Sequence, residues 1–286
     1  MTIYDFIDSL CCPDCKANIE IDGENLICMD CKRTFRVYYG ICADMLPSKK
    51  SRRSAKTELE RKSFTVYNKL FDEPFTWKDN PSPWGLAVPK NYINKLQKHK
   101  HMVYSLIPNR INRFIDISAG SGRFSIELAN RSEVCFLCDI SVDSAIYLTG
   151  LVLKEKIENV LVVRCDYTSL PFKSDVFDFC LCNDTLIYGP DHEKNVLLSI
   201  YEISKKGGSC VLDFSNKYHR GFWHKPYTYG YSKRQMIDML LNTGFKIDVC
   251  LPLYYEFAHD IEEKKFITKL INLVVPPTRY VFRVVK

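Results

Sequence analysis

The sequence has no long apolar run. No uncharged apolar stretch approaches the ~20 residues that a helix needs to cross a bilayer. The chain also does not open with a charged segment followed by an apolar one, as a secretory signal does. A membrane-spanning protein and a secreted protein are therefore disfavoured, and we expect a cytoplasmic protein. Its 286 residues are 46% hydrophobic and 26% charged, which is enough for one large core and one small additional module.

Disulfides are not expected either, although the chain has 13 cysteines. Four of them form two C-x-x-C pairs near the N-terminus, and most of the others stand among apolar residues in strand-like runs. This distribution indicates a reducing compartment, with metal-bound thiolates at one end of the chain and buried core thiols elsewhere.

Charge is unevenly distributed along the chain. The net charge is +6, yet residues 32–69 hold eleven Lys and Arg against three Asp and Glu, so the rest of the chain is close to neutral. Within this stretch, residues 47–62 show no apolar periodicity. They form either a solvated linker or a strip that contacts the phosphates of a nucleic acid or of an anionic lipid surface.

The two C-x-x-C pairs have the spacing of a metal site. Each pair lets two thiolates converge on one tetrahedral ion, and the twelve residues between the pairs can form a hairpin that turns at Asp22-Gly23. A segment of about forty residues cannot otherwise bury enough apolar surface to hold its shape. We therefore predict a structural Zn²⁺ ion held by Cys12, Cys15, Cys28 and Cys31. Two alternatives stay open: a redox role, disfavoured because no βα pattern follows the pairs, and Cys11 in place of Cys12.

A glycine-rich turn follows a short apolar run near the middle of the chain. Residues 113–118 (RFIDIS) are predicted as a strand, and residues 119–125 (AGSGRFS) lead into a helix that starts near Ile126. Glycine lets a ligand approach the backbone closely at such a strand-to-helix turn. Ser125 stands where the dinucleotide-binding fingerprint has its third glycine, and this disfavours a nicotinamide enzyme.

Further strands and helices follow at the spacing of βαβ units. Strands are predicted at residues 133–138, 160–164, 176–182 and 208–214, with helices at 141–156 and 193–205. Asp139 ends the second strand, where its carboxylate can accept both hydrogen bonds of a ribose diol. A helix at 232–242 with Ser232 as N-cap, strands at 245–251 and 280–285, and a helix at 262–273 complete the pattern. The sequence therefore predicts a doubly wound α/β fold with ligands at the carboxyl ends of parallel strands.

Together these motifs resemble the class I S-adenosylmethionine-dependent methyltransferases. The resemblance covers about residues 105–250, and its most particular part is the run D-x-x-x-L-P-F-x-x-x-x-F-D from Asp166 to Asp178. It implies a Rossmann-like sheet of seven strands with an antiparallel last strand. One departure is Ser118-Ala119, where the family often has Gly-Cys or Gly-Ala.

The first part of the chain resembles the zinc ribbons that precede many methyltransferase domains. Residues 34–46 share their closing apolar strand, Gly-Ile pair and Met-Leu pair. The implied organisation is a zinc ribbon at 1–47, a basic linker with a helical and proline-rich cap at 48–104, and a methyltransferase domain at 105–286.

The cofactor of the family is S-adenosylmethionine, and the resemblance implies which residues hold it. The backbone of residues 119–122 is expected to cradle the methionine end, Asp139 the ribose hydroxyls, and Asp166 with Tyr167 the adenine. The full set of cofactor-binding residues expected on this basis is Asp116, Ser118, Ala119, Gly120, Gly122, Asp139, Ile140, Asp166, Tyr167 and Asn183.

Methyl transfer from a sulfonium is an in-line displacement, so the protein supplies alignment, desolvation and, for a hydroxyl or an acidic carbon, a base. The candidate bases are His192 after the fourth strand, and His219 and His224 after the fifth. Alternatively, His192 belongs to the first turn of a helix and the other two are exposed loop residues. Residues 183–186 (NDTL) lack the Asn/Asp-Pro-Pro-aromatic signature of the base-amino methylases that flip a nucleotide.

Three functions remain for such a chain. The first is methyl transfer to an oxygen, carbon or nitrogen of a small or lipid-like metabolite, favoured by the aromatic residues after the fifth strand and the near-neutral remainder of the chain. The second is RNA methylation, since some rRNA guanine methyltransferases carry a zinc ribbon before the same fold and the linker here is basic. The third is a zinc-ribbon binding protein with an inactive methyltransferase-like domain, which the intact motif residues disfavour.

Overall fold

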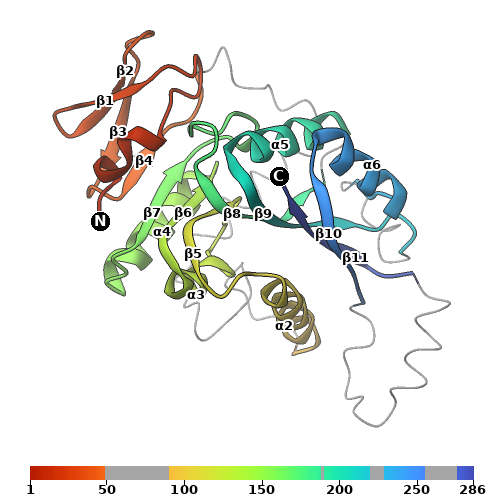
Figure 1. Ribbon diagram of the computed structural model, residues 1–286. Coiled ribbons are helices and arrows are strands. Elements are labelled where there is room, and N and C mark those ends of the chain that lie inside the picture. The colour runs from red at the N-terminus through yellow and green to blue at the C-terminus, as the bar shows by residue number, and fades with distance from the viewer. Residues whose placement is uncertain (49–89, 188–189, 220–228, 255–275) are drawn as a thin grey trace.

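The computed structural model describes residues 1–48, 90–187, 190–219, 229–254 and 276–286. Within these residues, eleven strands form one sheet in the order β1-β2-β3-β4-β7-β6-β5-β8-β9-β11-β10 (Figure 1). The predicted helix at 262–273, most of the basic linker and the candidate base His224 lie outside the described residues. In the described part of the chain, no helix is both long enough and apolar enough to cross a membrane.

Seven of these strands form the sheet that the sequence predicts. They are β5 (Ile111–Ile117), β6 (Ser132–Asp139), β7 (Val160–Arg164), β8 (Phe177–Leu186), β9 (Ser204–Ser215), β10 (Lys246–Leu253) and β11 (Arg279–Val285). Strands β5 to β9 pair in parallel, and β11 inserts antiparallel between β9 and β10. The predicted doubly wound, seven-stranded α/β sheet is confirmed, and the carboxyl ends of β5 to β8 lie along one edge.

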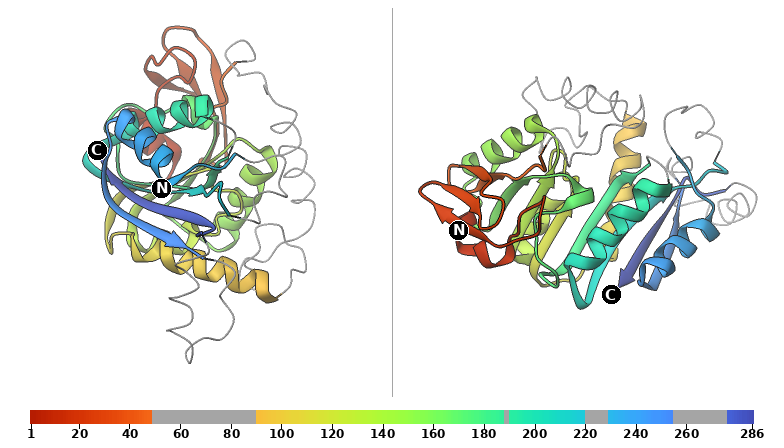
Figure 2. Two further views of the ribbon diagram at one scale, coloured as in Figure 1. Left: turned by 90° about the vertical axis from the view of Figure 1, so that its right-hand side faces the viewer. Right: turned by 90° about the horizontal axis from the view of Figure 1, so that it is seen from above.

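Helices cover both faces of the sheet (Figure 2). One face carries α2 (Lys90–Ser105), α3 (Ser125–Leu128) and α4 (Val142–Lys154), and the other carries α5 (Pro190–Ile203) and α6 (Lys233–Thr243). Each face has its own apolar core. Val103 of α2 and Leu148 of α4 belong to the first core, whereas Val196 of α5 and Leu240 of α6 belong to the second.

The four N-terminal strands extend the main sheet at its β7 edge (Figure 1). β1 (Ile19–Asp22) and β2 (Asn25–Cys28) form the predicted hairpin, and β3 (Thr34–Tyr38) joins β2 antiparallel. β4 (Cys42–Asp44) then pairs in parallel with β7, with Asp44 opposite Arg164. The cysteine-bearing module is therefore hydrogen-bonded to the main sheet, a connection that the sequence pattern does not indicate.

Two elements differ from the predicted ones for physical reasons. β8 continues past the predicted end at Cys182 to Leu186, which pairs with Phe214 of β9 after an irregularity in the register. Within this irregularity, the Asp184 N–H donates to the Asp213 side chain, at Oδ1, over 2.8 Å. Helix α2 is rich in lysine and histidine, so its short apolar stripe does not stand out in the sequence. The N-cap of α6 is confirmed, since the Ser232 side chain accepts the backbone N–H three residues on.

Candidate functional site

The glycine-rich turn after β5 contains three residues with left-handed backbone conformation. The φ angles are +65° at Ser118, +56° at Gly120 and +72° at Gly122. A Cβ atom at Gly122 would lie 2.8 Å from Ile126 Cγ1 and 3.0 Å from Leu148 Cδ2, whereas a Cβ at Gly120 would meet no heavy atom within 4 Å. The turn is thus closely packed on its protein side and open at Gly120. The left-handed angle at Ser118 also explains why glycine is common at that position in the resembled family.

The carboxylate at the end of β5 is held from within the same turn. Asp116 is buried and accepts a hydrogen bond from Ser125 Oγ. Burial raises the pKa of Asp116 to about 7. Ser125, the residue that replaces the third fingerprint glycine, therefore serves as a donor to the acid at the strand end.

Asp139, at the end of β6, is tied directly to the open turn. Its Oδ2 accepts the Gly120 N–H at 2.9 Å, and its Oδ1 accepts the Ser141 N–H at 2.9 Å. Two backbone N–H groups thus hold the Asp139 carboxylate beside the open side of the turn. Ile140 follows, half-buried, and its carbonyl accepts from Arg164 Nε at 3.2 Å.

The loop after β7 brings a candidate base close to a candidate adenine contact. Asp166 caps the short 3-10 helix η3 (Tyr167–Ser169) by accepting the Thr168 N–H at 2.9 Å. Tyr167 packs edge-to-face on His192, with 5.2 Å between the ring centroids. His192 is buried in the first turn of α5, as the alternative interpretation of this residue has it.

Asn183 lies near the carboxyl end of β8, the strand that pairs with β5. In this pairing Leu181 is opposite Asp116, so Asn183 follows two residues beyond the end of the paired segment. The side chain is 7% exposed, and neither the oxygen nor the nitrogen of its amide has a hydrogen-bond partner among the described residues. Since nearly all buried polar groups in folded proteins are hydrogen-bonded, this amide indicates a place for a polar ligand or an ordered water.

The two loop histidines after β9 have different outcomes. His219 is buried, and its Nε2 lies 3.4 Å from Thr278 Oγ1. The interpretation of His219 as an exposed loop residue is therefore wrong, because the residue is buried and its ring lies beside Thr278. His224 lies outside the described residues.

A buried ion-pair network lies near the carboxyl ends of the parallel strands, beside the glycine-rich turn. Most of its members could not be identified from the sequence. Its members are His99 of α2, Arg123 of the glycine-rich turn, Asp184 of β8, Asp213 of β9 and Arg279 of β11. Arg123 Nη2 lies 2.6 Å from Asp184 Oδ2, and His99 Nε2 lies 3.1 Å from Asp213 Oδ2. Arg279 Nη1 contacts both carboxylates. The network therefore joins α2, the glycine-rich turn and three strand ends.

The charges of this network are balanced by its arginines. Burial alone would raise the pKa of both carboxyl groups, but Arg279 and Arg123 hold the pKa of Asp184 well below its usual range, and Arg279 lowers that of Asp213. His99, Asp184 and Asp213 also bring three potential metal-ligand atoms within 4.8 Å of one another. Because two guanidinium groups already neutralise the carboxylates, we interpret the group as an ion-pair network and not as a metal site. One signal could have revealed it: Asp213 interrupts an otherwise apolar strand.

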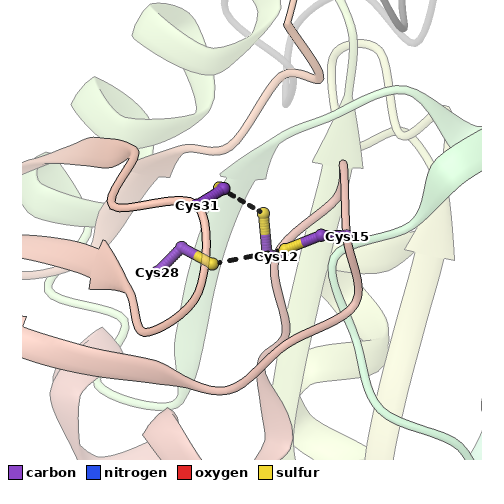
Figure 3. Close-up of side chains that lie close together, drawn as sticks. All are labelled: Cys12, Cys15, Cys28 and Cys31. Atoms are coloured by element: carbon purple, nitrogen blue, oxygen red, sulfur yellow. Dashed lines mark hydrogen bonds between the residues drawn. The ribbon is translucent and has the colours of Figure 1, made fainter.

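The four predicted metal ligands converge at one point between the two knuckles (Figure 3). Cys12 Sγ lies 3.7 Å from Cys31 Sγ, Cys15 Sγ lies 3.4 Å from Cys28 Sγ, and all four sulfur atoms are within 4.8 Å of one another. A tetrahedral ion with Zn–S bonds of about 2.3 Å holds its sulfur ligands about 3.8 Å apart. The arrangement therefore fits Zn²⁺. Cys11 is buried and does not belong to the group.

The thiols of the centre differ in acidity before any metal binds. Burial raises the pKa of Cys12 to about 12. At Cys28, the backbone N–H groups of Cys31 and Asp30 outweigh burial and lower the pKa to about 7. Binding of a divalent ion by all four sulfurs must therefore release protons.

Comparison with known proteins agrees with this geometry. Residues 115–212, from β5 to β9, match the family described as "Methyltransferase domain". An uncharacterized protein of Methanocaldococcus jannaschii is 24% identical over 192 residues, which are 63% of this chain and 81% of that protein. The tRNA (guanine(37)-N(1))-methyltransferase Trm5b of Pyrococcus abyssi is 25% identical over 134 residues, which are 47% of this chain but only 36% of the enzyme.

The fold is also found in solved structures. The N-methyltransferase NodS of Bradyrhizobium japonicum, solved in complex with S-adenosyl-L-homocysteine, aligns with a TM-score of 0.56 and 10% identity over 78% of this chain and 98% of NodS. The methyltransferase-domain match covers residues 115–212, and the strand order agrees with the methyltransferase fold that the sequence predicts.

Proposed function

We propose that this chain, whose residues 115–212 match a methyltransferase domain, methylates an oxygen, carbon or nitrogen of a small or lipid-like metabolite. S-adenosylmethionine would bind at the carboxyl ends of β5 to β8. The proposal rests mainly on the buried Asn183 amide, which has no hydrogen-bond partner among the described residues. Asn183 is on β8, which pairs with β5, and β5 leads into the turn that is open at Gly120. An amide without hydrogen-bond partners, next to accessible backbone, fits a ligand that carries both hydrogen-bond donors and hydrogen-bond acceptors.

The residues at this edge suit the parts of the cofactor. The backbone of residues 119–122, flanked by Asp116 and Ser118, would hold the methionine end, and Asp139 would accept the ribose hydroxyls. Asp166, Tyr167 and Ile140 would surround the adenine, and Asn183 would face the sulfonium end. The cofactor supplies the activated methyl group. The protein therefore has to align the acceptor with that methyl and exclude water.

An acceptor hydroxyl or acidic carbon also needs a base. His192 is the first candidate, since its ring packs edge-to-face on Tyr167 and its Nδ1 lies 3.8 Å from Glu193 Oε2. His219 and His224 are the other candidates. The near-neutral charge outside residues 32–69 supports an acceptor that is not a polyanion.

A crystal structure with S-adenosylhomocysteine tests the proposal. We expect the Asn183 amide within hydrogen-bond distance of the ligand and the Asp139 carboxylate on its ribose. A ligand bound away from the β5–β8 edge would overturn the assignment. In the same structure, the side chains that face the sulfur would identify the acceptor pocket and its base.

RNA is the second candidate acceptor, and two observations favour it. Residues 32–69 are strongly basic, and the Pyrococcus abyssi relative is named as a tRNA methyltransferase. Phosphate contacts release counterions, so RNA binding through this stretch must weaken steeply as salt increases. RNA affinity measured over a salt series separates the two acceptors: a steep loss supports RNA, and absent or flat binding supports the metabolite.

We also propose that the four-cysteine centre holds one structural Zn²⁺ ion. Four thiolates complete the tetrahedron and leave no position for a catalytic water. The 13 cysteines, all of which lie in the described residues, form no disulfide, and we propose a reducing, cytoplasmic environment for the protein. Extensively dialysed protein should retain about one zinc per chain, and protein without zinc would refute the centre.

A further inference from the structure

The loop that carries Asp166 and Tyr167 is hydrogen-bonded, at residues 169–173, to the first cysteine knuckle and to the residues directly before it. We call residues 166–173 the 166–173 loop and residues 12–16 the first knuckle. Four hydrogen bonds, donor first, join this region: Ser169 Oγ to Pro13 O at 2.6 Å, Lys16 Nζ to Leu170 O at 2.9 Å, Cys11 N to Pro171 O at 3.1 Å and Lys173 N to Ser9 O at 3.0 Å. A β-bridge between Leu10 and Phe172 completes the contact.

The Pro13 carbonyl and the Lys16 ammonium contact the loop, and the closed turn of the knuckle sets their positions. Pro13 lies between the ligands Cys12 and Cys15, and Lys16 follows directly. The knuckle closes by a hydrogen bond from Lys16 N to Cys12 O at 2.9 Å, with a left-handed φ of +61° at Lys16. The four cysteine sulfur atoms converge at one point beside this turn (Figure 3), so an ion bound by them would hold the turn closed. The Pro13 carbonyl and the Lys16 ammonium would then contact the loop from a position that the bound ion maintains.

We propose that the metal-bound first knuckle positions the 166–173 loop for the adenosine end of S-adenosylmethionine, so that zinc occupancy and cofactor affinity are coupled. The inference rests on the proposed cofactor site. Lys16 and Pro13 act as positioning residues, since they touch the loop and not the reacting atoms. Coupling between two sites is reciprocal, so the bound cofactor must also retain the zinc.

The second knuckle provides a matched control. Lys32 follows Cys31 as Lys16 follows Cys15, has a φ of +57°, and donates its N–H to Cys28 O at 3.1 Å. Its ammonium is exposed and makes no hydrogen bond or ion pair with any described residue. Lys16→Ala and Lys32→Ala therefore remove the same charge from the same backbone conformation, and only the first removes a contact with the loop.

The first measurement is the affinity of the zinc-loaded protein for S-adenosylhomocysteine by calorimetry. We expect Lys16→Ala to weaken binding about fivefold, which corresponds to roughly 1 kcal/mol, and Lys32→Ala to stay within about twofold of the wild type. Lys16→Arg, which keeps a donor on a long side chain, should restore most of the affinity. All variants should hold about one zinc per chain.

The second measurement is the zinc affinity, determined by equilibrium competition with a chromophoric chelator. Saturating S-adenosylhomocysteine should raise the zinc affinity of the wild type at least about threefold and that of Lys16→Ala much less. The inference needs both results. Equal S-adenosylhomocysteine affinities of Lys16→Ala and Lys32→Ala, or a zinc affinity that does not change with the ligand, would overturn it while leaving the cofactor site in place. A wild-type protein that binds no S-adenosylhomocysteine would overturn the proposed function as well.

Discussion

Alanine at Gly122 and alanine at Gly120 should damage the protein in different ways. Both glycines lie in the same turn with left-handed φ angles of +72° and +56°. A Cβ at Gly122 would press on Ile126 and Leu148 at 2.8 and 3.0 Å, while a Cβ at Gly120 would meet nothing within 4 Å. The first substitution therefore strains the fold, and the second fills space that we assign to the cofactor.

The expected magnitudes follow from these contacts. A left-handed alanine costs about 1–2 kcal/mol, partly offset because alanine has less backbone entropy to lose on folding than glycine. Gly120→Ala should thus lower the free energy of unfolding by only about 1 kcal/mol. Gly122→Ala adds overpacking against two side chains, which costs a further 1–3 kcal/mol or so. Its total loss should be about 2–4 kcal/mol.

Urea unfolding and calorimetry with S-adenosylmethionine separate the two effects. Gly120→Ala should bind the cofactor at least about tenfold more weakly while it unfolds close to the wild type. The reverse order of stability losses would refute the packing argument. Unchanged affinity in Gly120→Ala would refute the assignment of the open side of the turn to the cofactor.

Three further predictions concern the acids, the ion-pair network and the metal. Burial raises the pKa of Asp116 to about 7 from a usual value of 3.8, so the stability it contributes is present below about pH 4 and lost as the pH rises through 7. Asp116→Asn should therefore gain stability relative to the wild type over this range in urea titrations, and a pH-independent difference would contradict this. Arg279→Met should lower the free energy of unfolding by about 3–5 kcal/mol, because it leaves the Asp213 carboxylate buried without its guanidinium partner. Arg110→Ala, which removes an exposed ion pair, should change it by less than about 0.5 kcal/mol in the same assay. Equal losses in the two variants would refute the network. Cys15→Ser should reduce zinc retained after dialysis well below one per chain, and full retention would exclude it as a ligand.

Features carried by local pattern could be predicted from the sequence. The predicted third strand, 160–164, coincides with β7 because a strand covered on both faces is an unbroken apolar run. Ser232 marks the start of α6 because its side chain accepts a nearby backbone N–H. The C-x-x-C spacing predicts that the four sulfur atoms lie close together, because the two thiols of each pair lie on one tight turn and point to the same side.

Features carried by contacts between distant residues could not be predicted. The ion-pair network joins His99, Arg123 and Asp184 to Asp213 and Arg279 further along the chain, and only Asp213, inside an apolar strand, differs in the sequence from an ordinary surface charge. The contact between Lys16 and Leu170 spans 154 positions and ends on a backbone carbonyl. Every residue has a backbone carbonyl, so the residue type at position 170 does not indicate that its carbonyl accepts a hydrogen bond from Lys16.

The central claim is that the β5–β8 edge binds S-adenosylmethionine, and Asp139 tests it most directly. Its carboxylate accepts the Gly120 N–H, and we propose that it also accepts the ribose hydroxyls. Calorimetry should show micromolar binding to the wild type and an affinity at least about tenfold lower for Asp139→Ala. No binding to the wild type below millimolar concentration, or equal affinities for the two proteins, would contradict the account.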